Sequence, residues 1–277
     1  MYKAKKSLGQ NFLKSTLALN KIIEAGEISP NDFILEIGPG KGALTEKLLE
    51  KSGKVIAVEK DRELFEFLKI KFKKEIKANT LILVCEDILK ISPTQTLPKG
   101  KGYKIIANIP YNITGAILKK FLTEKNQPSL MVLMVQNEVA KRIVARDKKE
   151  SILSISVKAY GEPKYILKVP ARYFSPIPKV DSAAIVIKNI SRKNFLPLLN
   201  KERAGVRFLN SPPLNLPLVK EEEFWEIVRS GFAHKRKKLS SNLKLIKNLI
   251  NLEKTKNLGN KRAEELSLKD WLDLAKN

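Results

Sequence analysis

The chain contains very little of the two residue types that most often hold transition metals. Among 277 residues there is one cysteine, Cys85, and one histidine, His234. A single cysteine excludes a disulfide within the chain, and together the two residues are too few for a Cys/His zinc cluster. Cys85 ends an apolar run, so we expect a buried, unreactive thiol. His234 stands in a basic stretch without a triad partner, so we expect it on the surface or facing RNA. The sequence predicts no metal site.

Long apolar runs are also absent. No stretch approaches the roughly 18 apolar residues of a membrane-spanning helix. The first residues do not form a charged region followed by an apolar one, as a secretory signal would. We therefore expect a cytoplasmic protein without a membrane partner.

Acidic residues are few relative to basic ones. The chain has 53 Lys and Arg against 29 Asp and Glu, a formal net charge of +24. Such an excess indicates a polyanionic partner. Without a membrane feature, it favours nucleic acid. The alternative explanation of the charge is a general enrichment of lysine in the source proteome.

Short apolar runs alternate with stretches of helical periodicity in the first two thirds of the chain. These runs are 33–37, 54–58, 81–85, 104–107 and 130–135. The alternation predicts a parallel sheet covered by helices on both faces. Two further candidate strands, 164–169 and 183–188, are joined by a Pro-rich loop, which predicts an antiparallel pair. The segment 151–160 is compatible with either strand or helix.

After about residue 190 the strand-like runs end. Apolar residues then recur at helical spacing in 221–233, 239–252 and 263–275, while 193–220 is rich in proline and predicts a linker. We therefore expect two domains, an α/β domain over residues 1–190 and a small all-α domain over residues 191–277.

A glycine-rich loop, residues 38–42, follows the first strand of the predicted sheet and opens a helix. Glycine lets the backbone approach a ligand closely, and the helix N-terminus faces that ligand. The next strand ends at Glu59, nineteen residues after Gly40, where an acid can accept from both ribose hydroxyls. The following strands end at Asp87 and Asn108. Polar residues thus lie at the carboxyl ends of four successive strands, where open α/β sheets bind ligands.

The spacing of the glycines distinguishes among adenosine-containing ligands. The third glycine comes one residue too early for the dinucleotide fingerprint, and the chain has no G-x-x-x-x-G-K-[ST] P-loop. S-adenosylmethionine fits best, because it has a ribose and an adenine but no phosphates. Nearby acidic residues also suit its sulfonium cation.

The string Asn108-Ile109-Pro110-Tyr111 indicates the chemistry. The exocyclic amine of a nucleobase is a poor nucleophile, because its lone pair is delocalised into the ring. A site that alkylates it must accept hydrogen bonds from the amine, hold the ring and present an electrophilic carbon in line. Asn followed by Pro and an aromatic residue supplies these parts, which predicts an amino-methyltransferase.

Read together, these motifs resemble the ribosomal RNA adenine N6,N6-dimethyltransferase family, within the Rossmann-like methyltransferases. The resemblance runs in order along nearly the whole chain. The matching segments are KSLGQNFL (6–13), EIGPGKGALT (36–45), VEKD (58–61), EDIL (86–89), NIPYNIT (108–114), QNEVA (136–140), FSPIPKVDS (174–182), FAHKRKKLSSNL (232–243) and RAEEL (262–266). Each motif alone occurs in other methyltransferases, whereas the ordered set is specific.

The resemblance implies a mostly parallel Rossmann-like sheet of seven strands, one antiparallel, and a C-terminal all-α domain. It implies S-adenosylmethionine as cofactor and S-adenosylhomocysteine as product. Glu59 would bind the ribose and Asp87 the adenine amine. The full set of implied cofactor-binding residues is Gln10, Asn11, Leu13, Gly38, Gly40, Glu59, Lys60, Asp87, Ile88 and Asn108.

For the target adenine, the resemblance implies that the Asn108 side-chain oxygen and the Ile109 carbonyl accept from the N6 amine. Pro110 would stiffen the turn, and Tyr111 and Phe174 would stack on opposite faces of the flipped base. The residues implied in RNA binding are Lys235, Arg236, Lys237 and Lys238. The implied substrate is a pair of adjacent adenosines near the 3′ end of 16S rRNA in the small ribosomal subunit or its precursor, modified late in ribosome biogenesis by a monomeric enzyme.

Two features depart from the family pattern. The segment 193–220 is longer than the usual connection, and Lys235 stands where relatives commonly carry arginine. Lysine keeps the charge but loses bidentate phosphate geometry. Two of these residues also have a purely structural interpretation. Phe174 could be an aromatic residue of the hydrophobic core, and the run 235–238 could be a solvated surface.

Three other functions remain as alternatives. One is a methyltransferase of the large-subunit RNA, of the macrolide-resistance type. The others are a ribosome-assembly factor and a nucleic-acid-binding descendant without activity. The segments 174–182 and 235–243 favour the small-subunit enzyme. The presence of Glu59, Asp87 and Asn108 argues against lost activity.

Overall fold

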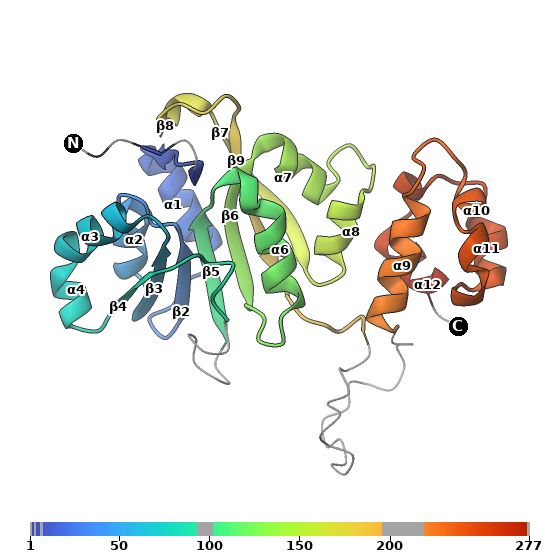
Figure 1. Ribbon diagram of the computed structural model, residues 1–277, viewed down its shortest axis with the longest axis horizontal. Helices are drawn as coiled ribbons and strands as arrows, with labels where there is room; N and C mark the ends of the chain where they lie inside the picture. Colours follow the sequence, from blue (N-terminus) through green and yellow to red (C-terminus); the bar gives the residue numbers. More distant parts are fainter. Residues whose placement is uncertain (1, 3, 6–7, 93–101, 196–218, 276–277) are drawn as a thin grey trace, which may run out of the picture. The chain divides into compact units, whose positions relative to one another are not determined.

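The computed structural model describes the chain except residues 1, 3, 6–7, 93–101, 196–218 and 276–277 (Figure 1). Contacts divide the chain into two compact units. The first comprises Met1–Val144 and Gly161–Ile190, and the second comprises Ala145–Tyr160 and Ser191–Asn277. Most of the long segment expected as a linker, 193–220, lies outside the described residues.

A seven-stranded sheet forms the first unit, with the strand order β4-β3-β2-β5-β6-β9-β7. Its strands are β2 (Phe33–Ile37), β3 (Lys54–Glu59), β4 (Leu81–Cys85), β5 (Tyr103–Asn108), β6 (Leu130–Gln136), β7 (Glu162–Val169) and β9 (Ser182–Lys188). Strands β2 to β6 are parallel, whereas β9 is antiparallel to both of its neighbours, β6 and β7. The predicted mostly parallel sheet with one antiparallel strand is therefore confirmed.

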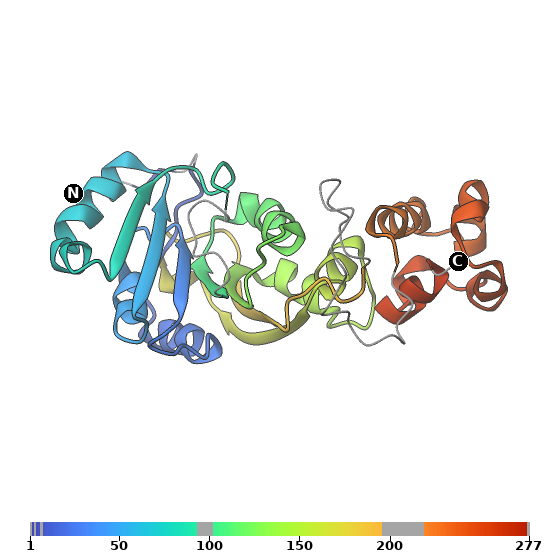
Figure 2. The same cartoon turned by 90° about the horizontal axis from the view of Figure 1, so that it is seen from below.

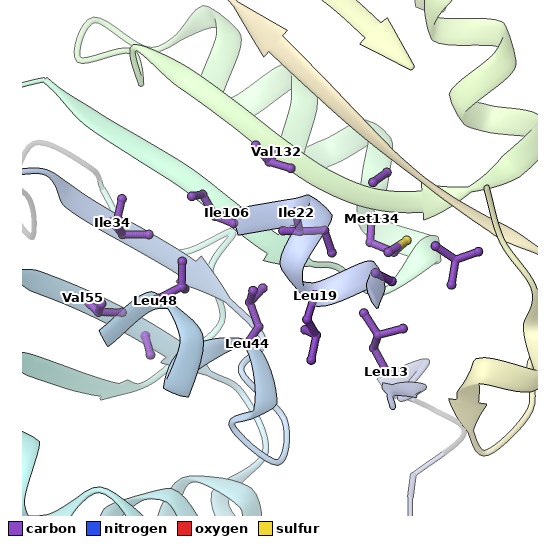
Figure 3. Packing of buried hydrophobic residues seen from close by; sticks show 14 of the residues in the cluster. Leu13, Leu19, Ile22, Ile34, Leu44, Leu48, Val55, Ile106, Val132 and Met134 are labelled. Atoms are coloured by element: carbon purple, nitrogen blue, oxygen red, sulfur yellow. The ribbon is translucent and has the colours of Figure 1, made fainter. Parts of the chain in front are cut away.

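Helices cover both faces of this sheet, with α1 and α6 on opposite sides (Figure 2). The helices are α1 (Thr16–Ala25), α2 (Ala43–Leu49), α3 (Arg62–Lys71), α4 (Lys73–Lys77), α6 (Thr114–Thr123) and α7 (Asn137–Val144). Apolar residues at helical spacing bury one face of α1 and α2 against the sheet (Figure 3). The labelled core residues are Leu13, Leu19, Ile22, Ile34, Leu44, Leu48, Val55, Ile106, Val132 and Met134.

A second, two-stranded sheet joins distant parts of the first unit. Strand β1 (Phe12–Leu13) pairs antiparallel with β8 (Phe174–Ser175). The sequence did not predict this pairing, because strands of two residues leave no periodic pattern. Its effect is to tie the N-terminal residues to the loop that precedes β9.

The expectation of a buried Cys85 is wrong, because the thiol is exposed. Strand β4 lies at the edge of the sheet and pairs with β3. An edge strand has fewer neighbours, and only its first residue, Leu81, is buried. An apolar run alone does not reveal whether a strand is central or at the edge.

The second unit is helical. Its helices are α8 (Ile152–Lys158), α9 (Glu221–Gly231), α10 (Leu239–Asn242), α11 (Leu252–Leu258) and α12 (Leu268–Leu274). The ambiguous segment 151–160 is thus helical, and a capping box between Ser151 and Ser154 begins it. Among the described residues, none of the helices has the length and apolar content to cross a bilayer.

Residues 145–160 belong to this second unit, which differs from the domain boundary expected at residue 190. The Glu150 amide donates to the Glu264 carbonyl, and the Ser191 amide to the Tyr160 carbonyl. The Tyr160 ring also stacks on Trp225, with centroids 6.3 Å apart. These long-range contacts leave no trace in the local sequence pattern.

Candidate active site

A cleft of about 690 Å³ opens in the first unit where β2, β3 and β5 end. Each residue expected to bind the cofactor lines it, and so do residues 108–111. Parallel strands bring their carboxyl ends to one edge of the sheet, so residues far apart in sequence meet there.

The glycine-rich loop forms the floor of the cleft in a left-handed conformation. Gly38 has φ +66° and Gly40 has φ +60°. Residues other than glycine rarely adopt these backbone angles. A Cβ on Gly40 would lie 2.9 Å from the Phe12 ring, whereas a Cβ on Gly38 would meet only the Pro110 ring at 3.9 Å. The space beside Gly38 is therefore open to a ligand.

Glu59, at the end of β3, is held by two backbone amides. Its Oε2 accepts from the Gly40 amide at 3.1 Å, and its Oε1 accepts from the Asp61 amide at 2.8 Å. Burial raises the pKa of Glu59, although these hydrogen bonds oppose the shift. The carboxyl group is thus fixed in orientation, and each oxygen keeps a lone pair for a hydroxyl group of a ligand.

The sequence reasoning missed Glu36, which also lines the cleft. This residue is 1% exposed, and Thr45 Oγ1 donates to its Oε2 at 2.7 Å. Burial raises the pKa of Glu36 to about 8, and the charge of Glu59 acts in the same direction. The available signal was an ionisable residue inside the otherwise apolar run 33–37.

At the mouth of the cleft, Asp87 forms an ion pair with Lys60. The Lys60 Nζ lies 2.9 Å from Asp87 Oδ2, and the Leu89 amide donates to Oδ1 at 2.9 Å. The Lys60 ammonium lowers the pKa of Asp87. An ionised carboxylate is therefore available there as a hydrogen-bond acceptor.

Asn108, the last residue of β5, has an oriented side-chain amide. Its Nδ2 donates to the Asn11 backbone carbonyl at 3.1 Å. One N–H of the amide is therefore occupied and the amide is oriented, and its oxygen is the atom that can accept from a ligand.

Tyr111 also lines the cleft. Its hydroxyl lies 2.5 Å from Oγ of the buried Ser182. Burial raises the pKa of Tyr111 above its usual value, so the phenol stays neutral. The hydrogen bond fixes one end of the ring.

Phe174 does not face the cleft, contrary to the expectation that it stacks on the target base. Its side chain is fully buried in the hydrophobic core, while the adjacent Ser175 lines the cleft. The pairing of Phe174 with Leu13 in the small sheet explains this position, because both side chains enter the same core cluster. The alternative interpretation of Phe174 as a core aromatic describes the structure.

The basic residues 235–238 lie in the second unit, in the turn between α9 and α10, and all four are exposed. Asn242 braces this turn, because its Nδ2 donates to the carbonyls of Gly231 at 2.6 Å and His234 at 3.1 Å. His234 is exposed, as expected. The turn presents a compact group of cations to solvent.

The sequence profile of the family described as ribosomal RNA adenine dimethylase matches residues 1–202. This chain belongs to that family. Membership is consistent with the cleft, in which backbone glycines, carboxyl groups and the oriented Asn108 amide converge at the ends of the strands.

Individual relatives cover nearly the whole chain. A protein of Dehalococcoides mccartyi (strain CBDB1), described as ribosomal RNA small subunit methyltransferase A, is 39% identical over 98% of this chain and 87% of its own. A protein of Fusobacterium nucleatum with the same description is 37% identical over 99% of this chain and 97% of its own.

Two solved structures share the fold. A dimethyladenosine transferase from Plasmodium falciparum has a TM-score of 0.74 and 26% identity, and covers 95% of each chain. The 23S rRNA methyltransferase ErmE has a TM-score of 0.71 and 22% identity, and covers 95% of this chain and 97% of its own. At 22% identity, the similarity to ErmE shows a shared fold alone.

The family member described here is an S-adenosylmethionine-dependent rRNA adenine dimethyltransferase. The predictions of family, enzyme class and methyl donor are confirmed. Two buried carboxyl groups, those of Glu36 and Glu59, line the cleft and offer oxygen acceptors to a polar ligand. When bound, the donor supplies an electrophilic methyl group.

Proposed function

We propose that this enzyme dimethylates N6 of two adjacent adenosines near the 3′ end of 16S rRNA, late in the biogenesis of the small ribosomal subunit. The observation that carries the chemistry is the Asn108 amide, whose nitrogen is bonded to the Asn11 carbonyl. The choice of subunit is supported by the relatives described as small-subunit methyltransferases, which match over 98% and 99% of this chain.

Asn108 and Ile109 orient the target amine in this proposal. The Asn108 oxygen and the Ile109 carbonyl accept hydrogen bonds from its two N–H groups, and both residues line the cleft. Holding both hydrogens turns the nitrogen toward the methyl donor, so that positioning and fixed dipoles contribute most of the rate. No strong base is needed, because the surplus proton leaves after the transfer.

The second methylation requires a rearrangement of the amine. N6-methyladenine has one N–H, so one of the two acceptors loses its hydrogen bond. Rotation about C6–N6 between the two transfers brings the remaining hydrogen to the acceptor that holds it best. Tyr111 stacks on the ring throughout, and base stacking of this kind is worth about 1–3 kcal/mol.

For the cofactor, we propose that Glu59 binds the ribose hydroxyls and Asp87 the adenine amine. Gly38 leaves room beside the backbone, and Ile88 provides an apolar wall. The further residues proposed around the cofactor are Gln10, Asn11, Leu13, Gly40 and Lys60.

The basic turn 235–238 is proposed to bind rRNA phosphates. Its four exposed cations lie next to one another, which favours a contact with the RNA backbone over one with base edges. We propose a monomeric enzyme that acts in the cytoplasm, on the small subunit or its precursor.

Methyl incorporation into purified ribosomal subunits tests the proposal. Small subunits that lack this modification are incubated with labelled S-adenosylmethionine, and the RNA is digested to nucleosides. We expect N6,N6-dimethyladenosine at a pair of positions in small subunits and no label in large subunits. Label in large subunits would identify the resistance-type enzyme instead. Tight binding to small subunits without label would indicate an assembly factor.

A substitution of Asn108 tests the assigned acceptor. Asn108→Ala removes one placed dipole, so turnover should fall about 100-fold. Binding of S-adenosylhomocysteine, measured by calorimetry, serves as the internal control and should change less than about threefold. Unchanged turnover would show that Asn108 does not hold the amine.

A further inference from the structure

The residues before α1 lie against the cofactor cleft. We call residues 8–13 the N-terminal strap, and all six of them line the cleft. One end of the strap is secured by the pairing of β1 with β8. The other end is secured by hydrogen bonds to a single side chain, that of Asp61.

Asp61 accepts hydrogen bonds from the strap and from the residues before it. Gln10 Nε2 donates to Oδ2 at 3.0 Å, and Lys5 Nζ donates to Oδ1 at 3.0 Å. The Tyr2 hydroxyl lies 2.7 Å from Oδ2 and 2.6 Å from Gln10 Oε1. The Asp61 side chain is 0% exposed and that of Lys5 is 38% exposed, so the carboxylate is covered by the groups that bind it.

The Asp61 carboxyl group is ionised at neutral pH. Burial alone would raise its pKa, but hydrogen bonds from Tyr2, Lys5 and Gln10 outweigh burial and lower the pKa to about 2. Hydrogen bonds to a charged, buried group are stronger than those between neutral groups. This carboxylate is therefore a firm attachment point.

Asp61 and the strap are connected both to Glu59, on the cofactor side of the cleft, and to Asn108, on the side proposed for the target base. The Asp61 amide donates to Glu59 Oε1 at 2.8 Å. On the strap, the Asn11 carbonyl accepts from the Asn108 amide at 3.1 Å. A displacement of the strap would therefore change the cleft wall and the orientation of Asn108 together.

We propose that Asp61 is a positioning residue that fastens the N-terminal strap over the cleft and thereby holds the Asn108 amide in place. This inference rests on the proposed binding of the cofactor in this cleft. Without the fastening the strap opens, the cofactor dissociates faster, and Asn108 loses the carbonyl that orients it.

Asp61 has a second role, which a substitution must leave intact. Asp61 is the N-cap of α3, where its Oδ1 accepts from the Glu63 amide at 3.0 Å. Serine caps helices about as well as aspartate, so Asp61→Ser keeps the cap and removes the carboxylate that binds Lys5 and Gln10.

For Asp61→Ser we expect the dissociation constant of S-adenosylhomocysteine, measured by calorimetry without RNA, to rise about tenfold. Amide hydrogens of residues 8–13 should exchange faster, while the amides of α3 should not. An unchanged dissociation constant, or faster exchange confined to α3, would overturn the proposal.

A second variant approaches the contact from the other side and leaves α3 intact. Lys5→Met should weaken cofactor binding in the wild-type background and have a smaller effect in the Asp61→Ser background, where Lys5 keeps only its ion pair with Glu63 at 2.7 Å. If the two substitutions raised the dissociation constant independently, so that their fold-changes multiplied in the double variant, the proposed attachment of the strap to Asp61 would be contradicted. Lys21→Met is the matched control, because it removes an exposed ion pair with Glu24 on α1. Failure of the wild-type enzyme to bind S-adenosylhomocysteine would instead refute the proposed cofactor site.

Discussion

The buried Glu36 carboxyl group makes the stability of the first unit depend on pH. Its pKa in the folded protein is about 8, against an ordinary value of 4.5. Between these two values the folded state keeps a proton that the unfolded state has released. The free energy of unfolding therefore falls as pH rises through this range, by about 1.4 kcal/mol per pH unit. Above about pH 8 the loss is complete.

The magnitude is large relative to the stability of a domain. From about pH 5 to about pH 8 the loss reaches about 4 kcal/mol, whereas domains are typically stable by only about 5–15 kcal/mol. Glu36→Gln removes the titration. The amide oxygen can still accept from Thr45 Oγ1, which lies 2.7 Å from Glu36 Oε2. The variant should gain stability relative to the wild type as pH rises.

The assay must report on the first unit. Both tryptophans, Trp225 and Trp271, lie in the second unit, so their fluorescence does not suit the purpose. Urea unfolding followed by circular dichroism is suitable, and the transition of the first unit is identified as the one that S-adenosylhomocysteine shifts. The exposed Glu162→Gln controls for loss of a carboxylate. A stability difference between wild type and Glu36→Gln that does not change with pH would refute the reasoning.

Three further predictions concern the ligand sites. Gly40→Ala forces a side chain into a left-handed backbone position and toward the Phe12 ring; calorimetry should show cofactor binding weakened about tenfold or more. Tyr111→Phe loses the hydrogen bond to Ser182 but keeps the ring; thermal unfolding should show a loss of about 1 kcal/mol, with turnover retained within a few fold. Neutralising the three cations at 235–237 should lower the slope of log affinity against log salt by about 2–3; an unaltered slope would place the RNA-binding face elsewhere.

The cofactor half of the cleft was predictable because its signals are local. A strand, a glycine-rich loop and an acid after the next strand lie in a short stretch, and the carboxyl ends of parallel strands coincide. Gly38, Glu59 and Asn108 therefore line one cleft, as the spacing predicted. The sheet itself was predictable for the same reason, since each strand is a separate apolar run.

Features that depend on distant pairing were not predictable. Phe174 is buried because two residues near the N-terminus pair with its strand, and no periodicity records that contact. Cys85 is exposed because β4 is at the edge, which follows from strand order. The importance of Glu36 depends on its burial, and that of Asp61 depends on partners far away in the sequence.

The position of β9 has a consequence for the order in which the site is completed during synthesis. This strand is the last of the sheet to leave the ribosome, yet it lies between β6 and β7, which are made earlier. A nascent chain that ends before Ser182 already has Gly38, Glu59 and Asn108, but β7 still lacks its neighbour and Tyr111 lacks the hydroxyl that anchors it. The cofactor side of the cleft is thus assembled first, and the base side closes only when the final strand inserts.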